Sequence, residues 1–306
     1  MKILVATDKP FAPVAVRMIR EVAEGAGHEL ALLEKYTGVD QLLEAVADAD
    51  AMIVRSDIIS ADVVKAAKKL KIVVRAGAGY DNLDLVACTA SNVVAMNTPG
   101  QNSNAVAELV FEMMLFNARG GFSGKSGSEL RGKKLGIHAF GYVGKYVAGI
   151  AHGFGMEVYA FDPFIDQAEI VAAGVKACKT VEELYSTCQY ISLHIPANDK
   201  TKKSIGKALL KSMPAGAVLV NTARKEVIDE EGLIQIMDER ADFVYLSDIE
   251  PDCKATFDEK YKGRFIFTAK KMGAQTEEAN INAGVAAARQ IADFFATGST
   301  KFKVNK

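Results

Sequence analysis

The sequence is poor in the residues that mark metal-binding, disulfide-bonded and membrane-inserted proteins. It holds four cysteines and four histidines among 306 residues. The cysteines form no C-x-x-C pair and the histidines have no metal-ligand spacing, so we expect reduced thiols and no metal site. No apolar run approaches the ~18 residues of a membrane span, and the N-terminal run is too short for a signal peptide. We therefore expect a soluble cytoplasmic protein with no membrane partner.

The sequence also lacks an excess of charge of either sign. Its 37 basic and 38 acidic residues give a formal net charge of −1, and no long run of like charges occurs. Without a basic surface, nucleic acid is not an expected partner. The length and the 49% of hydrophobic residues are sufficient for about two domains with separate cores.

Residues 132–163 have the pattern of a β-α-β unit. An apolar strand over 135–139 runs into a glycine turn, and a helix begins near Tyr142. A second strand over 156–161 ends at Asp162. The flanking strands and helix favour a dinucleotide-binding site at this turn, because a glycine-rich turn without them is often only structural.

The turn reads A-F-G-Y-V-G, a dinucleotide fingerprint with Ala139 in the first glycine position. Gly141 allows the backbone to approach a pyrophosphate, Gly144 allows close helix packing, and the helix N-terminus offers free N–H groups. We expect Ala139 to adopt a negative φ. Asp162 lies where a carboxylate accepts the adenosine ribose hydroxyls and repels a 2′-phosphate, which predicts NAD rather than NADP.

Apolar runs alternate with helical patterns both before and after this unit, as in parallel sheets with crossover helices. The segment TPGQN (98–102) ends the first series. A final helix over roughly 276–297 begins with an N-cap-like Thr276, and we expect it to pack back on the first domain. The expected division is a substrate-binding domain of residues 1–102 and 273–306, and a nucleotide-binding domain of residues 103–272.

Polar residues follow most of the apolar strands, at the edge where an open α/β sheet binds its ligand. In the first domain these are Arg55-Ser56, Arg75 to Asn82, and Asn102-Ser103; in the second they are His194 to Pro196, Asn221 to Arg224, Asp248 to Pro251, and Lys270 to Gly273. A single polar group at a strand end is often only a solvated charge. Seven such groups at corresponding strand ends predict a ligand-binding cleft.

Six segments carry a resemblance to a known family. They are RAGAGYDNLD (75–84), NTPGQNSNAVAELV (97–110), GKKLGIHAFGYVGK (132–145), SLHIPANDKTK (192–202), VNTARKEVIDEEGL (220–233) and TEEA (276–279). Together they resemble the D-2-hydroxyacid dehydrogenase family, most closely its members that act on 3-phosphoglycerate. The resemblance implies an α/β fold of two doubly wound parallel-sheet (Rossmann-like) domains with an interdomain cleft. It also implies NAD as cofactor and a homodimer through the nucleotide-binding domain. Longer members carry a C-terminal regulatory domain, which we do not expect here.

The resemblance also assigns catalytic residues. Arg224 matches the arginine that binds the substrate carboxylate and keto oxygen, a role suited to a bidentate guanidinium. Glu250 matches the acid that orients the catalytic base. The base is commonly a histidine, but here TAKKMGAQTEEA (268–279) places Lys271 at that position, or Lys270 if the alignment shifts by one. Either a lysine transfers the proton or the protein has lost catalysis.

Further residues match binding positions of the family. The cofactor contacts would be Tyr142 and Val143 at the pyrophosphate, Ile195 and Pro196 beside the adenosine ribose, and Thr222 and Asp248 near the nicotinamide. The substrate contacts would be the backbone N–H groups of Ala78 and Gly79, together with Asn102 and Arg224. Arg55, Ser56 and Arg75 at strand ends suit a substrate with two anionic groups. Surface salt bridges are the alternative for these two arginines.

The expected activity is therefore NAD-dependent oxidation of 3-phospho-D-glycerate at C2 to 3-phosphohydroxypyruvate, the entry to serine biosynthesis. One alternative is a reductase of glyoxylate, hydroxypyruvate or another 2-keto acid. Another is a non-catalytic NAD-binding sensor like the corepressors of this fold. For the active enzyme we expect Lys271, paired with Glu250, to be the acid/base. Desolvation, Arg224 and Lys270 would lower its pKa, and Glu250 would raise it.

Overall fold

The computed structural model describes all 306 residues and divides them into two compact units. Unit 1 comprises Met1–Asn102 and Gln275–Lys306, and unit 2 comprises Ser103–Ala274. The chain thus leaves unit 1 after Asn102 and returns to it at Gln275, whereas the sequence placed the return at 273. None of the helices is long and apolar enough to cross a bilayer.

Unit 1 is built on a five-stranded parallel sheet in the order β2-β1-β3-β4-β5. Its strands are β1 (Lys2–Thr7), β2 (Glu29–Glu34), β3 (Ala51–Val54), β4 (Ile72–Arg75) and β5 (Val94–Asn97). The central strand β3 is apolar and buried at every position. Such unbroken apolar runs are typical of parallel strands that helices cover on both faces.

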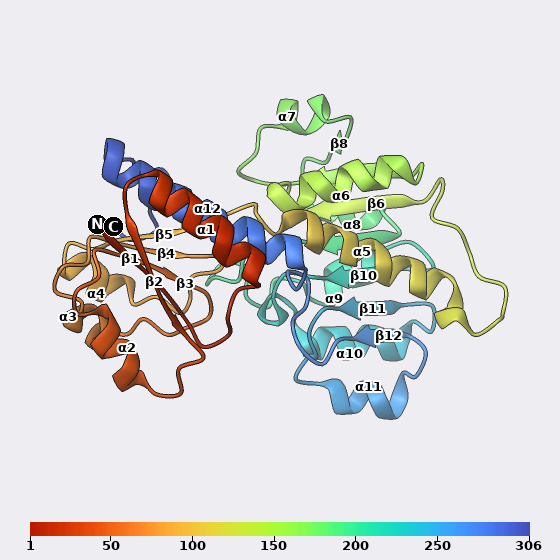
Figure 1. Cartoon of the computed structure of the whole chain (residues 1–306). Helices are drawn as coiled ribbons and strands as arrows, with labels where there is room; N and C mark the ends of the chain where they lie inside the picture. The colour runs from red at the N-terminus through yellow and green to blue at the C-terminus, as the bar shows by residue number, and fades with distance from the viewer. The chain divides into compact units, whose positions relative to one another are not determined.

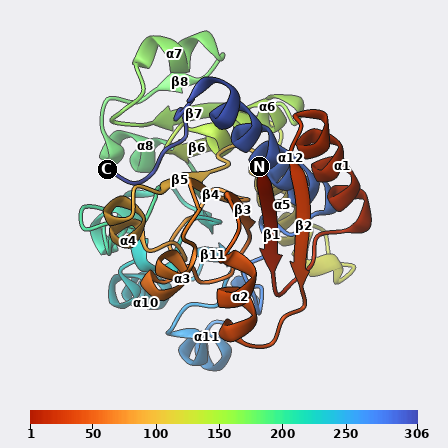
Figure 2. The same cartoon turned by 60° about the vertical axis from the view of Figure 1, so that its left-hand side comes forward.

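The helices of unit 1 form two layers (Figure 2). Helices α1 (Pro13–Gly25) and α12 (Glu277–Thr297) pack together over one face of the sheet. The other face is covered by α2 (Val39–Val46), α3 (Ala61–Ala66) and α4 (Leu85–Ala90). The Thr276 hydroxyl caps α12 by accepting the N–H of Ala279 at 3.1 Å. The last helix therefore belongs to the core of unit 1.

Unit 2 contains a seven-stranded parallel sheet in the order β12-β11-β10-β9-β6-β7-β8. Its strands are β6 (Lys134–His138), β7 (Glu157–Phe161), β8 (Lys176–Ala177), β9 (Tyr190–Leu193), β10 (Val218–Asn221), β11 (Val244–Ser247) and β12 (Phe265–Phe267). Both units thus have the predicted α/β class with parallel sheets.

The helices of unit 2 also cover both faces of its sheet. One face carries α5 (Ser103–Ala118), α6 (Tyr142–Gly153) and α7 (Gln167–Ala172), and Figure 1 shows α5 alongside α6. The other carries α8 (Val181–Thr187), α9 (Lys207–Ser212), α10 (Glu230–Glu239) and α11 (Lys254–Lys260). Two short 3-10 turns, Gly120–Phe122 and Lys225–Val227, complete the unit.

The strand order reverses once in each sheet, between β1 and β3 in unit 1 and between β6 and β9 in unit 2. Doubly wound sheets bind their ligands outside the carboxyl ends of the strands at this point. In unit 2, His138 at the end of β6 pairs in register with Leu193 at the end of β9. The glycine turn after β6 and residues 194–196 after β9 therefore share this edge.

Candidate active site

The glycine turn after β6 has the shape of a pyrophosphate-binding turn. Ala139 has φ 82°, so the expectation of a negative φ is wrong. The first fingerprint position needs a backbone conformation that glycine adopts freely, and alanine adopts it here at a cost in strain. A Cβ on Gly144 would lie 2.5 Å from the Ala139 carbonyl oxygen, which explains the glycine. A Cβ on Gly141 would meet nothing within 4 Å, so there is space beside the N-terminus of α6.

Asp162, directly after β7, fastens this turn to the neighbouring strand end. Its Oδ2 accepts the N–H of Phe140 and its Oδ1 accepts the N–H of Phe164, both at 2.8 Å. Each carboxylate oxygen retains a lone pair that can accept a further hydroxyl. Phe140 is fully buried and packs in the core, whereas Phe164 is 90% exposed.

The other expected cofactor residues lie at the same edge of the sheet. Tyr142 and Val143 form the first turn of α6, and Tyr142 is exposed. Ile195 is buried and Pro196 exposed directly after β9. The hydroxyl of Thr222, after β10, is buried and has no hydrogen-bond partner. Because such a hydroxyl is costly unless a ligand completes it, the residues present fit a bound dinucleotide.

Lys271 is held by several acceptors in unit 2. Its Nζ donates to the Ala223 carbonyl at 2.8 Å and to the Thr222 carbonyl at 3.2 Å. It also lies 2.8 Å and 3.1 Å from the two carboxylate oxygens of Asp248. Desolvation is the main cause that lowers the pKa of Lys271, and the Arg224 charge adds to it, whereas Asp248 acts in the opposite direction.

The expected pairing of Lys271 with Glu250 is wrong. Asp248 follows β11 directly and its side chain is 1% exposed, so it points inward to the lysine. Glu250 is two residues further along, where the chain has left the sheet, and its Oε1 lies 3.9 Å from Lys254 Nζ. Lys270 is exposed, so of the two lysines it is Lys271 that reaches this cluster.

Arg224 lies at the same edge as Lys271. Asn221, the last residue of β10, donates from Nδ2 to the Arg224 carbonyl at 3.0 Å and so fixes this loop. The Arg224 Nη1 donates to the Ala223 carbonyl at 3.0 Å. Most of the guanidinium donors remain available, and the side chain is partly exposed. Two cations and one buried carboxylate therefore lie at the carboxyl ends of β10 and β11.

The Arg55 side chain is held tightly within unit 1. Its Nη1 donates to the Lys9 carbonyl at 2.9 Å and its Nη2 donates to Asn280 Oδ1 at 2.6 Å. The guanidinium also lies over the Phe11 ring, 5.1 Å from its centre. Arg75 donates from Nε to the Arg55 carbonyl at 3.1 Å. The sequence patterns did not reveal Asn280, because it acts on Arg55 from a helix 225 residues away along the chain.

The loop after β4 offers backbone N–H groups. Asn97 donates from Nδ2 to the Ala78 carbonyl at 2.6 Å, and the Thr98 N–H donates to the Gly77 carbonyl at 3.0 Å. No hydrogen bond within the chain takes the N–H groups of Ala78 and Gly79. Two such groups suit a carboxylate. Asn102, the last residue of this part of unit 1, is partly exposed.

Comparison with known proteins identifies the family. Residues 105–255 match the model of the D-isomer specific 2-hydroxyacid dehydrogenase, NAD binding domain. The chain is 34% identical to hydroxypyruvate reductase of Thermotoga maritima over 221 residues, which are 68% of this chain and 71% of that protein. The chain belongs to the D-isomer specific 2-hydroxyacid dehydrogenase family. The matched residues lie within unit 2.

Two further relatives are informative. The chain is 34% identical over 313 residues to D-3-phosphoglycerate dehydrogenase of Methanocaldococcus jannaschii, covering 95% of this chain and 57% of that protein. It therefore spans little more than half the length of this relative. It is also similar to the NAD⁺-bound structure of 3-phosphoglycerate dehydrogenase of Entamoeba histolytica, with 53% identity and a TM-score of 0.88. That similarity covers 100% of this chain and 99% of the other.

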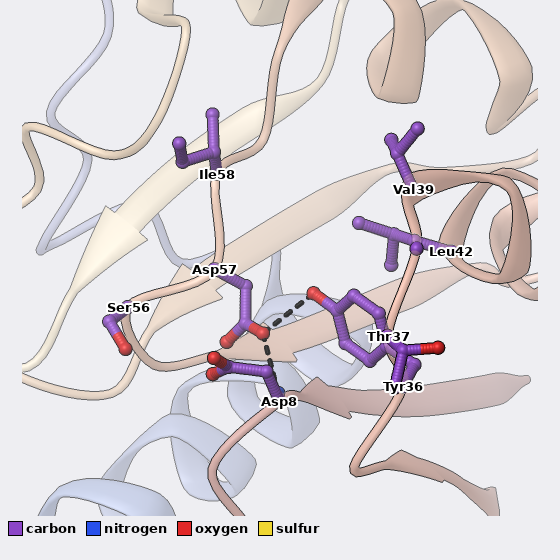
Figure 3. Close-up of a pocket in the computed structure, with 9 residues that line it drawn as sticks. Asp8, Tyr36, Thr37, Val39, Leu42, Ser56, Asp57 and Ile58 are labelled. Atoms are coloured by element: carbon purple, nitrogen blue, oxygen red, sulfur yellow. Dashed lines mark hydrogen bonds between the residues drawn. The ribbon is translucent and has the colours of Figure 1, made fainter.

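Unit 1 has a pocket of about 370 Å³ at the carboxyl ends of β1, β2 and β3 (Figure 3). Asp57 Oδ1 accepts the Tyr36 hydroxyl at 2.6 Å and the Asp8 N–H at 2.7 Å. Of the expected site residues, only Ser56 lines it. Two carboxylates, Asp8 and Asp57, make this pocket unfavourable for an anionic substrate.

Proposed function

We propose that the protein catalyses the NAD-dependent oxidation of 3-phospho-D-glycerate to 3-phosphohydroxypyruvate, as the first step of serine synthesis. The observation that carries this proposal is the cluster of Arg224, Lys271 and Asp248 at the same sheet edge as the dinucleotide turn of unit 2. Together these groups supply an anion-binding cation and a proton carrier. The similarity to the Entamoeba histolytica enzyme over the whole length of both chains supports the choice of substrate.

Arg224 binds the carboxylate and the C2 oxygen of the substrate and polarises the bond to that oxygen. NAD held at the glycine turn and Asp162 would supply the acceptor for the hydride that leaves C2. Lys271, as the neutral amine, takes the hydroxyl proton from the C2 oxygen, so that the carbon–oxygen double bond forms and the lysine becomes an ammonium. In the reverse direction the ammonium returns the proton. The desolvation that lowers the pKa of Lys271 makes the amine accessible at a lower pH than for an exposed lysine.

Unit 1 recognises the rest of the substrate. The free N–H groups of Ala78 and Gly79, with Asn102, bind the carboxylate. Arg55 and Arg75 bind the phosphate. The contacts that hold Arg55 support this role, because a fixed guanidinium loses little freedom when it binds an anion.

The active protein is a homodimer formed through unit 2. An apolar patch at the end of α5 supports this proposal: Phe116 and Phe122 are 38% and 72% exposed, and their rings meet edge to face at 5.0 Å. Exposed aromatic patches of this kind are frequent at protein interfaces. Light scattering in solution measures the mass and should give that of two chains.

The test is NADH formation from 3-phosphoglycerate, compared with D-glycerate and D-lactate. We expect the highest kcat/KM for 3-phosphoglycerate. Equal or better use of the unphosphorylated acids would refute 3-phosphoglycerate as the substrate.

Lys271→Ala should lower kcat by roughly 10²–10⁴-fold with little change in NAD affinity. Lys270→Ala is the matched control and should turn over normally. Loss of turnover in Lys270→Ala alone would assign the proton transfer to Lys270.

Reduction of hydroxypyruvate is the second candidate activity. It is favoured by the hydroxypyruvate reductase of Thermotoga maritima, of which this chain covers 71%. NADH consumption with hydroxypyruvate and with 3-phosphohydroxypyruvate separates the two candidates. A higher kcat/KM for the unphosphorylated keto acid would favour the reductase.

A further inference from the structure

Asp248 is the one carboxylate that touches the proposed proton carrier. Both of its oxygens lie within 3.1 Å of Lys271 Nζ, and Oδ2 also accepts the N–H of Gly273 at 3.1 Å. The contact to Gly273 ties the loop that carries Lys271 to the end of β11. Asp248 therefore fixes both the position of the lysine backbone and the direction of its side chain.

Glu250 has no comparable access to the lysine. Its side chain is 39% exposed, and its nearest cation is Lys254, four residues later, at 3.9 Å. An exposed contact of this length contributes little. Asp248 lies at the end of β11 and can therefore reach Lys271. Glu250 lies two residues further along, in the loop that leads to α11.

We propose that Asp248 is the positioning residue of the proton carrier Lys271, in the place expected of Glu250. This inference rests on the proposed function of Lys271. Two carbonyl groups, those of Ala223 and Thr222, accept N–H bonds from either the amine or the ammonium. The Asp248 carboxylate differs from them, because its charge favours the ammonium alone. Asp248 thus sets the pH at which the lysine can accept a proton.

Other charged groups near Lys271 also affect its pKa, and the effect of Asp248 adds to theirs. Arg224 opposes the ammonium, and Glu226 after β10 favours it weakly. Desolvation also opposes the ammonium and is the larger influence. Removal of the Asp248 charge leaves Glu226 as the only charged group that favours the ammonium, so the lysine should lose its proton at a lower pH.

The experiment is the pH dependence of kcat/KM for 3-phosphoglycerate oxidation in Asp248→Asn and Glu250→Gln. In the unchanged protein the rate rises with pH as Lys271 loses its proton. For Asp248→Asn we expect this rise to move to lower pH by about one unit or more, with a lower kcat at the plateau. For Glu250→Gln the rise should stay in place. A rise that moves with Glu250→Gln and not with Asp248→Asn would overturn the proposal.

A second measurement does not depend on turnover. Lysine side-chain NMR of the ligand-free protein, with the Lys271 signal assigned from Lys271→Arg, reports the titration of Lys271 directly. Its midpoint should fall in Asp248→Asn and should be restored towards the original value in Asp248→Glu. An unchanged midpoint in Asp248→Asn would refute the proposal. If the NMR midpoint shifts while 3-phosphoglycerate is not oxidised at all, the proposed activity is wrong and the role of Asp248 stands.

Discussion

The groups that contact a side chain set its position before a ligand binds, and Arg55 is the clearest case in this protein. Its guanidinium is fixed by the Lys9 carbonyl, the Phe11 ring and Asn280. A side chain that is fixed before binding keeps its donors aimed without paying for their ordering. The groups that orient Arg55 should therefore influence substrate affinity even though they carry no charge.

We predict that Asn280→Ala raises KM for 3-phosphoglycerate by roughly tenfold or more, since a hydrogen bond to a charged group contributes about 1.5–3 kcal/mol. The KM for NAD should not change. Asn282→Ala is the matched control, because Asn282 lies on the same helix and is exposed. Steady-state kinetics measure both variants. An equal effect of the two substitutions would show that the loss comes from the helix and not from Arg55.

Asp162 has both a structural and a selective role. Removing its charge while keeping an amide oxygen preserves an acceptor for the Phe140 N–H and ends the repulsion of a 2′-phosphate. We predict that Asp162→Asn narrows the preference for NAD over NADP by about tenfold, a change of about 1.4 kcal/mol. The ratio of kcat/KM for the two cofactors measures it. Asp166→Asn, in the same loop, should leave that ratio unchanged, and a wild-type ratio in Asp162→Asn would contradict the assignment.

At the scale of elements, α6 depends on two glycines with different surroundings. A Cβ at Gly144 would lie 2.5 Å from the Ala139 carbonyl oxygen and 3.0 Å from Ile137 Cγ2, whereas a Cβ at Gly149 would meet nothing within 4 Å. We predict that Gly144→Ala lowers the free energy of unfolding by about 1–3 kcal/mol through overpacking. It should also weaken NAD binding, because the helix moves away from the turn.

Gly149→Ala is the matched control for this helix. It should raise the free energy of unfolding by about 0.5–1 kcal/mol, because alanine costs less entropy than glycine inside a helix. Urea denaturation of both variants measures the contrast. If Gly144→Ala is as stable as Gly149→Ala, then strand β6 and helix α6 do not pack as closely as the structure describes.

The sequence predicts elements better than side-chain partners. The fingerprint, its flanking strands and the last helix follow from apolar periodicity and glycine spacing, which are local properties. The partner of Lys271 does not follow from such patterns. Whether Asp248 or Glu250 faces inward depends on the residue at which β11 ends, and boundaries are the least certain part of a sequence-based assignment. The positive φ of Ala139 was missed because alanine seldom adopts it.

At the scale of the whole molecule, the discontinuity of unit 1 arises from the burial of α12. Its apolar residues, including Val285, Ala288 and Ile291, lie in the core of unit 1 with residues of α1 and the sheet. The sequence predicted a helix here that packs back on the first domain. Strand order in the two sheets could not be read from the sequence, because any of several orders buries the same apolar strands.

The stability of the molecule should depend on pH through two histidines beneath the dinucleotide turn. His138 is buried, with its Nδ1 3.3 Å from the Tyr185 hydroxyl, and His194 Nε2 lies 2.9 Å from Ser192 Oγ. Desolvation lowers the pKa of His138 to about 4 and that of His194 to about 3, and the nearby His138 also contributes to the shift of His194. Neither group gains a proton readily while unit 2 is folded.

The sign of the effect follows from linkage. Between the usual histidine pKa of about 6.5 and these lowered values, the unfolded chain binds more protons than the folded one, so stability rises with pH in this range. We predict that the free energy of unfolding falls by several kcal/mol as the pH is lowered from about 6.5 to about 4. Urea denaturation at a series of pH values measures this slope. The slope should be smaller in His194→Asn and unchanged in His152→Gln, where an exposed histidine is replaced. Equal slopes in all three proteins would mean that carboxylates, and not these histidines, govern acid unfolding.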